Sequence, residues 1–252
     1  MSVAACAALV ERGDPDRFRA AMVVPVAARD VLFPLYAFNL EVARAPWVTQ
    51  EPMIAEMRLQ WWRDVLQELA GDGTARRHEV VDAMGFIDGP AADLLEALID
   101  ARRWDIEKAA FKDAAAFDAY IQSTAGNLMW TAARSFGAPG ETEGDVRRVA
   151  FASGLARFLQ AVPDLEAAGR IPLVDGRAEA IAALADRALT NMPPLRRVMR
   201  QVGTPARAAI LEAWQAPALL GQVRARPGLV SEGWMGLSPF GSSLRLMRLG
   251  FS

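Results

Sequence analysis

The chain has 252 residues, of which 52% are hydrophobic and 23% charged, and its formal net charge is −2. This length suits one or two domains with a substantial core, and the composition is that of an ordinary globular protein. The near-neutral charge argues against nucleic acid as the main partner, because binding to phosphates needs a basic surface.

The N-terminal segment and the cysteine content bear on the compartment. MSVAACAALVERGDPDRF has a short apolar run with no basic segment before it, which makes a poor signal peptide. Cys6 is the only cysteine, so we expect neither an intramolecular disulfide nor a cysteine-based zinc site. No uncharged apolar stretch reaches the ~18 to 20 residues that span a bilayer. We therefore expect a cytoplasmic protein, and peripheral membrane contact stays open.

The first clearly periodic helix is predicted over 56–71, EMRLQWWRDVLQELAG, with a stop at Gly71-Asp72-Gly73. Its apolar stripe is predicted to contain Met57, Trp61, Val65 and Leu69. The adjacent Trp62 cannot share that stripe, because neighbours on a helix diverge by roughly 100°. It either lines a cavity, covers an interface or fills a second packing layer.

Further helices are predicted along the rest of the chain, at 90–110, 113–140 and 143–162, the last closing before Pro163. Weaker helical patterns follow near 176–192 and 204–223. Residues 224–240 are predicted to form a loop, and 241–252 a short C-terminal helix or tail. Strand patterns are nearly absent. The prediction is one all-α domain over 1–252 with about eight to ten helices, distinct from an up-and-down four-helix bundle.

Catalytic motifs are scarce. His78 is the only histidine, and no Gly-x-Ser-x-Gly elbow or phosphate-binding glycine loop is present. Carboxylates at helical spacing are the remaining candidates for divalent cations. They occur in four groups: Asp93, Glu96 and Asp100; Asp14 and Asp16; Asp64 and Glu68; Glu141 and Asp145. For each group, a solvated helix face is the default interpretation.

Three segments in order resemble the squalene/phytoene synthase family. They are DPDRFRAAMVVPVAARDVLFPLYAFNLEVA (14–43), FDAYIQSTAGNLMWTAARSFGA (117–138) and ASGLARFLQAVPDLEAAGRIPL (152–173). The resemblance extends from about residue 5 to 175. It implies an all-α, single-domain isoprenoid-synthase-like bundle around a central cavity. Active members of that family hold magnesium, and through it prenyl diphosphates, with two aspartate-rich motifs on facing helices.

The sequence departs from the family at those motifs. Alignment on Leu35-Tyr36-Ala37-Phe38 puts the first motif on Ala43, Arg44 and Trp47. Alignment on Gly169-Arg170 puts the second on Ala161, Asp164 and Leu165, so only one carboxylate stands where about four are expected. Arg44 would also repel a cation there. The resemblance therefore implies the fold of a condensing enzyme without catalytic residues, a metal site or a cofactor.

Residues 38–69, FNLEVARAPWVTQEPMIAEMRLQWWRDVLQEL, resemble a branch of the same family that includes a mitochondrial complex I assembly factor. That branch also lacks the aspartates. This implies a non-catalytic protein that supports respiratory complex I assembly. Its partner would be a protein, either a complex I subunit or an assembly intermediate, or an isoprenoid lipid.

The candidate residues for the pocket or the partner are Tyr36, Asn39, Glu41, Arg44, Arg58, Gln60, Trp62, Tyr120, Asp164 and Arg170. Asn39, Glu41, Arg58, Gln60 and Trp62 are expected to flank the would-be pocket, where polar groups need partners.

Two alternatives stay open. In the first, the chain is an active prenyltransferase. It would either bind Mg²⁺ as its cofactor through relocated acids such as Asp64 or Asp93, or bind diphosphate through arginines alone. In the second, the chain is a helical scaffold or adaptor with a collapsed pocket.

Overall fold

The computed structural model describes residues 3–71 and 75–250, which form helices and turns without a strand. Within these ranges no helix combines the length and apolarity needed to cross a bilayer. The all-α prediction is confirmed. The elements are α1 (Val3–Gly13), α2 (Pro15–Met22), α3 (Val26–Arg44), α4 (Pro52–Ala70), η1 (Val81–Ala83), α5 (Gly89–Ala101), α6 (Trp104–Glu107), α7 (Ala114–Ile121), η2 (Gln122–Gly126), α8 (Asn127–Ser135), η3 (Gly140–Thr142), α9 (Glu143–Ala167), α10 (Ala178–Asn191), α11 (Leu195–Val202), α12 (Arg207–Ile210), η4 (Leu211–Ala213), α13 (Ala216–Ala225), α14 (Leu229–Glu232) and α15 (Pro239–Gly250).

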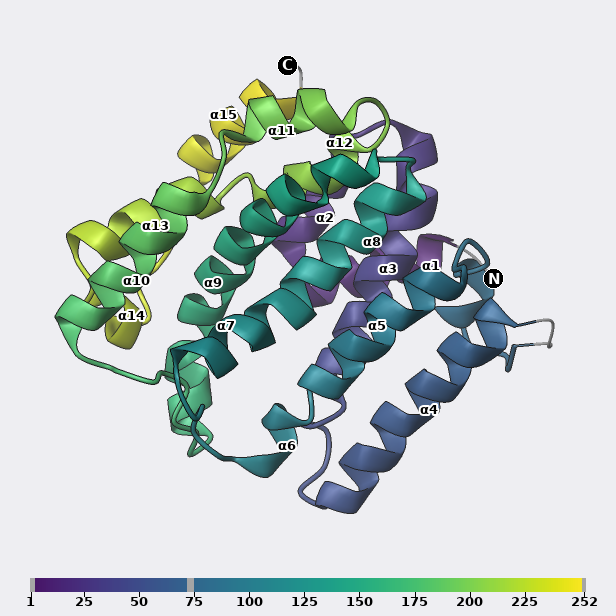
Figure 1. The fold of residues 1–252 in the computed structure, drawn as a ribbon, viewed down its shortest axis with the longest axis horizontal. Coiled ribbons are helices and arrows are strands. Elements are labelled where there is room, and N and C mark those ends of the chain that lie inside the picture. Colours follow the sequence, from purple (N-terminus) through teal and green to yellow (C-terminus); the bar gives the residue numbers. More distant parts are fainter. Residues whose placement is uncertain (1–2, 72–74, 251–252) are drawn as a thin grey trace.

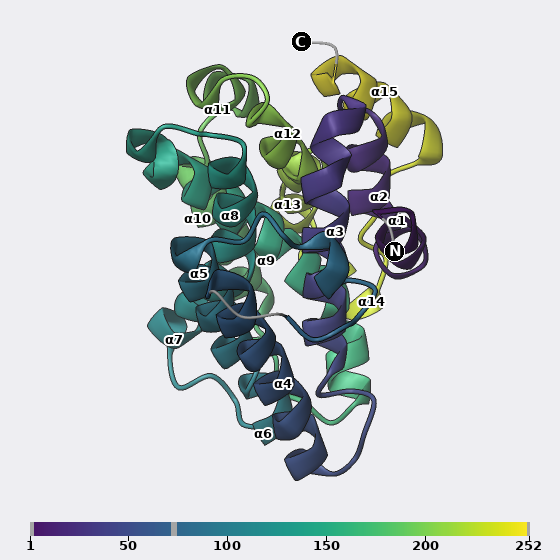
Figure 2. The same ribbon diagram turned by 90° about the vertical axis from the view of Figure 1, so that its right-hand side faces the viewer.

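The helices pack in two layers. Figure 1 shows α4, α5, α8 and α9 side by side across the molecule, with α10 and α13 packed beyond α9. Figure 2 shows α1, α2 and α3 on the other side, with α1 against α3. Helices α3 and α9 are therefore placed to form facing walls in the interior.

Two groups of buried side chains form the core. One lies among α1, α3, α4, α5 and α8 and contains Leu35, Phe38 and Trp62. The other lies among α7, α9, α10 and α13 and contains Phe117 and Phe158. Burial of these apolar side chains is the main stabilising contribution to such a fold. A cavity lies between α3 and α9, and it is the candidate functional site.

The buried face of α4 differs from the predicted stripe. Ala55, Leu59, Trp62, Val65 and Leu66 are buried. Of the predicted stripe, Val65 is buried and Trp61 and Leu69 pack half-buried against the core, but Met57 is exposed, so the prediction was wrong for Met57. Trp62 packs edge-on against Phe38, with ring centroids 5.3 Å apart, which is the second-layer alternative. The helix ends at Ala70, and Asp72 and Gly73 of the predicted stop lie outside the described residues.

Helix boundaries differ from the prediction at several prolines. Helix α9 continues through Pro163 to Ala167, although proline removes one backbone hydrogen bond from a helix. Helix α11 begins directly after Pro193-Pro194, where no helix was predicted. The 224–240 segment contains the four-residue α14, and α15 starts at Pro239. Because several helices are this short, the described part of the chain has more of them than the eight to ten expected.

Helix α7 continues into α8 through the π-helical turn η2. Thr124 in this turn donates its hydroxyl to the Tyr120 carbonyl at 2.7 Å, which satisfies an acceptor left by the wider turn. Such turns insert one residue into a helix and are frequent at functional sites. Here η2 brings Thr124 and Ala125 to the cavity between α3 and α9.

Candidate functional site

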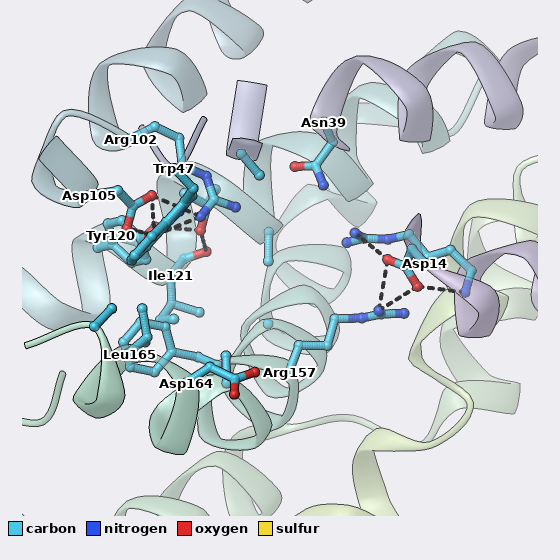
Figure 3. A pocket seen from close by; sticks show the side chains of 18 residues that line it. Asp14, Asn39, Trp47, Arg102, Asp105, Tyr120, Ile121, Arg157, Asp164 and Leu165 are labelled. Atoms are coloured by element: carbon cyan, nitrogen blue, oxygen red, sulfur yellow. Dashed lines mark hydrogen bonds and ion pairs between the residues drawn. The ribbon is translucent and has the colours of Figure 1, made fainter. Parts of the chain in front are cut away.

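A cavity of about 450 Å³ lies between α3, η2 and α9. Figure 3 shows two polar groups of side chains on opposite sides of it, one around Asp14 and one around Asp105. Its lining residues are Asp14, Arg17, Asn39, Ala43, Trp47, Arg102, Asp105, Tyr120, Ile121, Thr124, Ala125, Gly154, Arg157, Phe158, Ala161, Asp164, Leu165 and Ala168.

The first polar group is built on the start of α2. Asp14 caps this helix by accepting the backbone N–H of Arg17 at 3.0 Å. Its carboxylate also accepts hydrogen bonds from the side chain of Arg17 at 3.1 Å and from Arg157 at 2.9 Å. Arg17 in turn donates its Nε–H to Glu212 at 2.5 Å and lies over the Tyr36 ring. Both arginines are therefore committed to carboxylates at this side of the cavity.

The surroundings of Asp14 lower the pKa of its carboxyl group. Burial acts to raise this pKa, but the positive charges of Arg157 and Arg17 and their hydrogen bonds outweigh burial and lower it to about 2. An aspartate in an unfolded chain has a pKa of ~3.9. The folded pKa is the lower one, so the ionised carboxylate adds stability above about pH 4, and this stability is lost as the pH falls through about 2.

We expect the Asp14→Asn variant to be less stable than the wild type by roughly 2 kcal/mol at pH 7, with the difference vanishing toward pH 2. Asparagine still caps a helix, so the substitution tests the charge rather than the cap. Urea denaturation at a series of pH values between 2 and 7 measures this. Asp16→Asn, in the first turn of the same helix, is the matched control. A difference for Asp14→Asn that is constant across pH would contradict the assigned role.

The second polar group is built on the turn between α5 and α7. Arg102 donates to Asp105 at 3.2 Å and to the Tyr120 hydroxyl at 2.8 Å, and that hydroxyl donates to Asp105 at 3.2 Å. Burial raises the pKa of Asp105, although the charge of Arg102 opposes the rise. Burial also raises the pKa of Tyr120, so the phenol stays protonated and can donate. Asp105 is thus held by a guanidinium group and a hydroxyl group.

The wall between these groups is mostly apolar. The aligned motif positions Ala43, Trp47, Ala161 and Leu165 all line the cavity, so α3 and α9 do face each other across it. Asp164 is the one carboxylate among the aligned positions that reaches the lining. Within 3–71 and 75–250, no three acidic, histidine or cysteine side chains come together as a group that could hold a metal ion.

Five of the predicted residues lie in or beside the cavity. Asn39, Tyr120 and Asp164 line it. Tyr36 is buried directly beneath the Arg17 guanidinium, at 5.2 Å from ring centroid to Cζ. Arg170 lies behind the wall, where it donates to the Asp105 carbonyl oxygen and covers the Trp47 ring. The structure therefore brings these five together.

The other five do not line the cavity, which corrects their expected place at the pocket, while a role for them toward a partner stays a prediction. On α3, Asn39 and Ala43 are four residues apart and share the cavity face, so Glu41 points away. Arg44 is exposed, and the positive charge at the cavity comes from other arginines. On α4, Arg58 and Gln60 are exposed, whereas Trp62 is buried in the core.

The relocated acids of the alternative also lie elsewhere. Asp64 accepts a hydrogen bond from Gln60 at 2.7 Å and pairs with Arg76 at 3.7 Å. Asp93 is exposed on α5. Neither lines the cavity.

Arg17, Arg102, Asp105 and Arg157 were missed by the sequence-based prediction. Arg157 could have been predicted, because it lies four residues before the aligned motif position Ala161 and therefore on the same face of α9. Asp14 was noted only as a possible partner of Asp16. Its position directly before Pro15 marks a helix start, which was the available clue.

Comparison with known proteins places the chain in a family. The model of the squalene/phytoene synthase family matches residues 10–234. The human NADH dehydrogenase (ubiquinone) complex I, assembly factor 6, is 20% identical over 161 residues, which are 63% of this chain and 48% of the human protein. Its Drosophila melanogaster homolog is 39% identical over 64 residues, 25% of this chain and 19% of that protein. The chain spans about half the length of the human relative.

Two solved structures share the fold. A dehydrosqualene synthase crystallised with a ligand has a TM-score of 0.80 at 14% identity, covering 98% of this chain and 94% of that one. Squalene synthase from Alicyclobacillus acidocaldarius has a TM-score of 0.72 at 19% identity, covering 93% and 95%. These likenesses confirm the isoprenoid-synthase-like fold. Because the family model spans most of its length, the chain belongs to the squalene/phytoene synthase family.

Proposed function

We propose that this chain is a non-catalytic member of its family that supports respiratory complex I assembly by binding a protein partner. The observation that carries the proposal is that two acids at the cavity, Asp14 and Asp105, already have partners within the protein. Asp14 is held by two arginines, and Asp105 by Arg102 and Tyr120. Similarity to relatives named as complex I assembly factor 6 supports the assembly role. The cytoplasmic location stays a prediction.

The residues present do not fit a magnesium–diphosphate site. Magnesium needs several free carboxylate or phosphate oxygens in octahedral geometry. At the aligned motif positions the cavity offers alanine, tryptophan and leucine side chains, with Asp164 as the single acid. Recruiting Asp14 would leave Arg17 and Arg157 without one of their partners in a low-dielectric site, which is costly.

The purified protein, incubated with farnesyl or geranylgeranyl diphosphate and magnesium, should form no condensation product. The squalene synthase of Alicyclobacillus acidocaldarius, assayed in parallel, is the positive control. A deletion strain should lose NADH:quinone oxidoreductase activity while succinate:quinone oxidoreductase activity is unchanged. Condensation products would refute the non-catalytic proposal, and normal NADH oxidation in the deletion strain would refute the assembly role.

An isoprenoid lipid is the second candidate partner, favoured by the apolar side chains of Trp47, Ile121 and Phe158 in the cavity wall. Complementation of the deletion strain separates the two partners. Ala161→Phe fills the cavity from α9, whereas Ala167→Phe adds the same ring on the exposed side of that helix. If the partner is a protein on the outer surface, the Ala161→Phe and Ala167→Phe variants should restore the deletion strain equally. Selective failure of Ala161→Phe would favour the lipid.

A further inference from the structure

The charge of the chain is unevenly distributed. Residues 193–252 contain eight arginines and only two acidic residues, Glu212 and Glu232, although the whole chain is slightly acidic. Glu212 is buried against Arg17, and Glu232 pairs with Arg226. The exposed arginines of α11 and α15 are therefore not neutralised by acids from their own part of the chain.

Three of these arginines surround an apolar groove. The groove has a volume of about 620 Å³ and lies between α15, α13 and the connection from α10 to α11. Met192, Leu195 and Trp214 contribute to its apolar walls, and Arg196, Arg245 and Arg248 line it as well. Arg196 donates to the Arg248 carbonyl at 3.0 Å, which joins α11 to α15. The guanidinium groups of Arg245 and Arg248 form no ion pair within 3–71 and 75–250.

Exposed apolar side chains lie on α15 and near the turn between α2 and α3, outside the lining of the groove. Met247 on α15 is 47% exposed, and Val26 at the start of α3 is 70% exposed. The turn between α2 and α3 reaches the end of α15, because a Cβ added at Gly250 would lie 3.4 Å from Val23. Figures 1 and 2 place α11 and α15 at the same end of the molecule. We call the surface formed by Met22, Val26, Arg196, Arg245, Met247 and Arg248 the basic face.

We propose that the basic face docks on the surface of an anionic phospholipid bilayer. Arginines near such a surface are attracted by its negative potential, and exposed apolar side chains beside them bury themselves at the headgroup boundary. A nucleic acid or an acidic protein would use the arginines but would leave Met247, Val26 and the apolar groove without a role. The combination of charge and apolar surface favours the bilayer. This inference does not rest on the assembly role.

Vesicle flotation of the full chain tests the proposal. Vesicles of phosphatidylcholine alone are compared with vesicles that also contain phosphatidylglycerol, at low and high salt. The protein should bind only the anionic vesicles, and salt should weaken the binding because it screens exposed charges. The Arg245→Gln, Arg248→Gln double variant should bind about 30-fold more weakly, at ~1 kcal/mol for each arginine. Met247→Gln should bind about tenfold more weakly.

The matched control is the Arg12→Gln, Arg77→Gln double variant, which removes two exposed arginines outside the basic face. It should bind anionic vesicles like the wild type. Thermal melting of all variants checks that they are folded. Equal binding to neutral vesicles, no binding to either kind, or equal losses in the two double variants would overturn the proposal. So would binding to soluble polyglutamate without binding to vesicles, since that result assigns the face to an acidic protein.

Discussion

Replacing Arg17 with methionine should lower the free energy of unfolding by about 3 to 5 kcal/mol, because it breaks a buried ion pair from one side. Arg17 is 6% exposed and Glu212 is 3% exposed, so the remaining carboxylate would be left in the interior without its cation. The second carboxylate oxygen of Glu212 already lacks a hydrogen-bond partner among the described residues. For a domain with a typical stability of ~5 to 15 kcal/mol, this loss is severe. Urea denaturation followed by tryptophan fluorescence measures it.

Two further variants make this result specific. Arg12→Met removes an exposed arginine and should change stability by less than ~0.5 kcal/mol. The double variant Arg17→Met, Glu212→Met replaces the whole pair by apolar side chains, and it should recover much of the lost stability. An Arg17→Met protein as stable as the wild type would show that the ion pair does not contribute to the free energy of unfolding. A double variant no better than the single one would assign the loss to packing instead.

Gly154→Ala should destabilise the protein by about 1 to 3 kcal/mol, even though alanine is the better helix former. Gly154 lies inside α9 where this helix meets η2. A Cβ at this position would overlap the Cβ of Ala125 and lie 3.1 Å from Ile121 Cγ2. Neither atom is the end of a flexible side chain, so the helices would have to separate. Thermal and urea denaturation measure the cost.

Gly144→Ala is the matched control for this substitution. It lies in the same helix, and an added Cβ there meets nothing within 4 Å. We expect a stability gain of up to ~1 kcal/mol from its higher helix propensity. The double variant Gly154→Ala, Ala125→Gly returns the missing space and should restore most of the stability. If Gly154→Ala behaves like Gly144→Ala, then the contact between α9 and η2 is not tight.

Much of the fold was predictable because helices depend on local patterns. Pro90, the first residue of the helix predicted over 90–110, lies in the first turn of α5, and Asp88 caps that helix by accepting the Ala91 N–H. Gly137, close to the end of the helix predicted over 113–140, has a φ of +82° two residues after α8 ends. Such signals lie within a few residues of the structure that they determine. The same locality explains the errors, because Pro163 alone predicts the end of a helix, whereas tertiary packing lets α9 continue through it.

The candidate site was less predictable because its contacts are long-range. Asn39 and Tyr120 were found through the family resemblance. The partners of Asp14 and Arg17 lie 143 and 195 residues away, at Arg157 and Glu212. No spacing rule connects residues at such separations. Periodicity can place Arg157 on the face of α9 that includes Ala161, but only the packed helices show which acid it meets.

The arginine-held acids also limit how synthase activity could be introduced into this cavity. Introducing aspartates at Ala43 and Ala161 would put new negative charges into a space that already contains three guanidinium groups, those of Arg17, Arg102 and Arg157. Fixed cations compete with magnesium for any carboxylate placed beside them. Synthase chemistry in this cavity would therefore require replacement of the arginines as well as introduction of the acids. Single substitutions cannot provide both, so no single substitution is expected to turn this cavity into a synthase site.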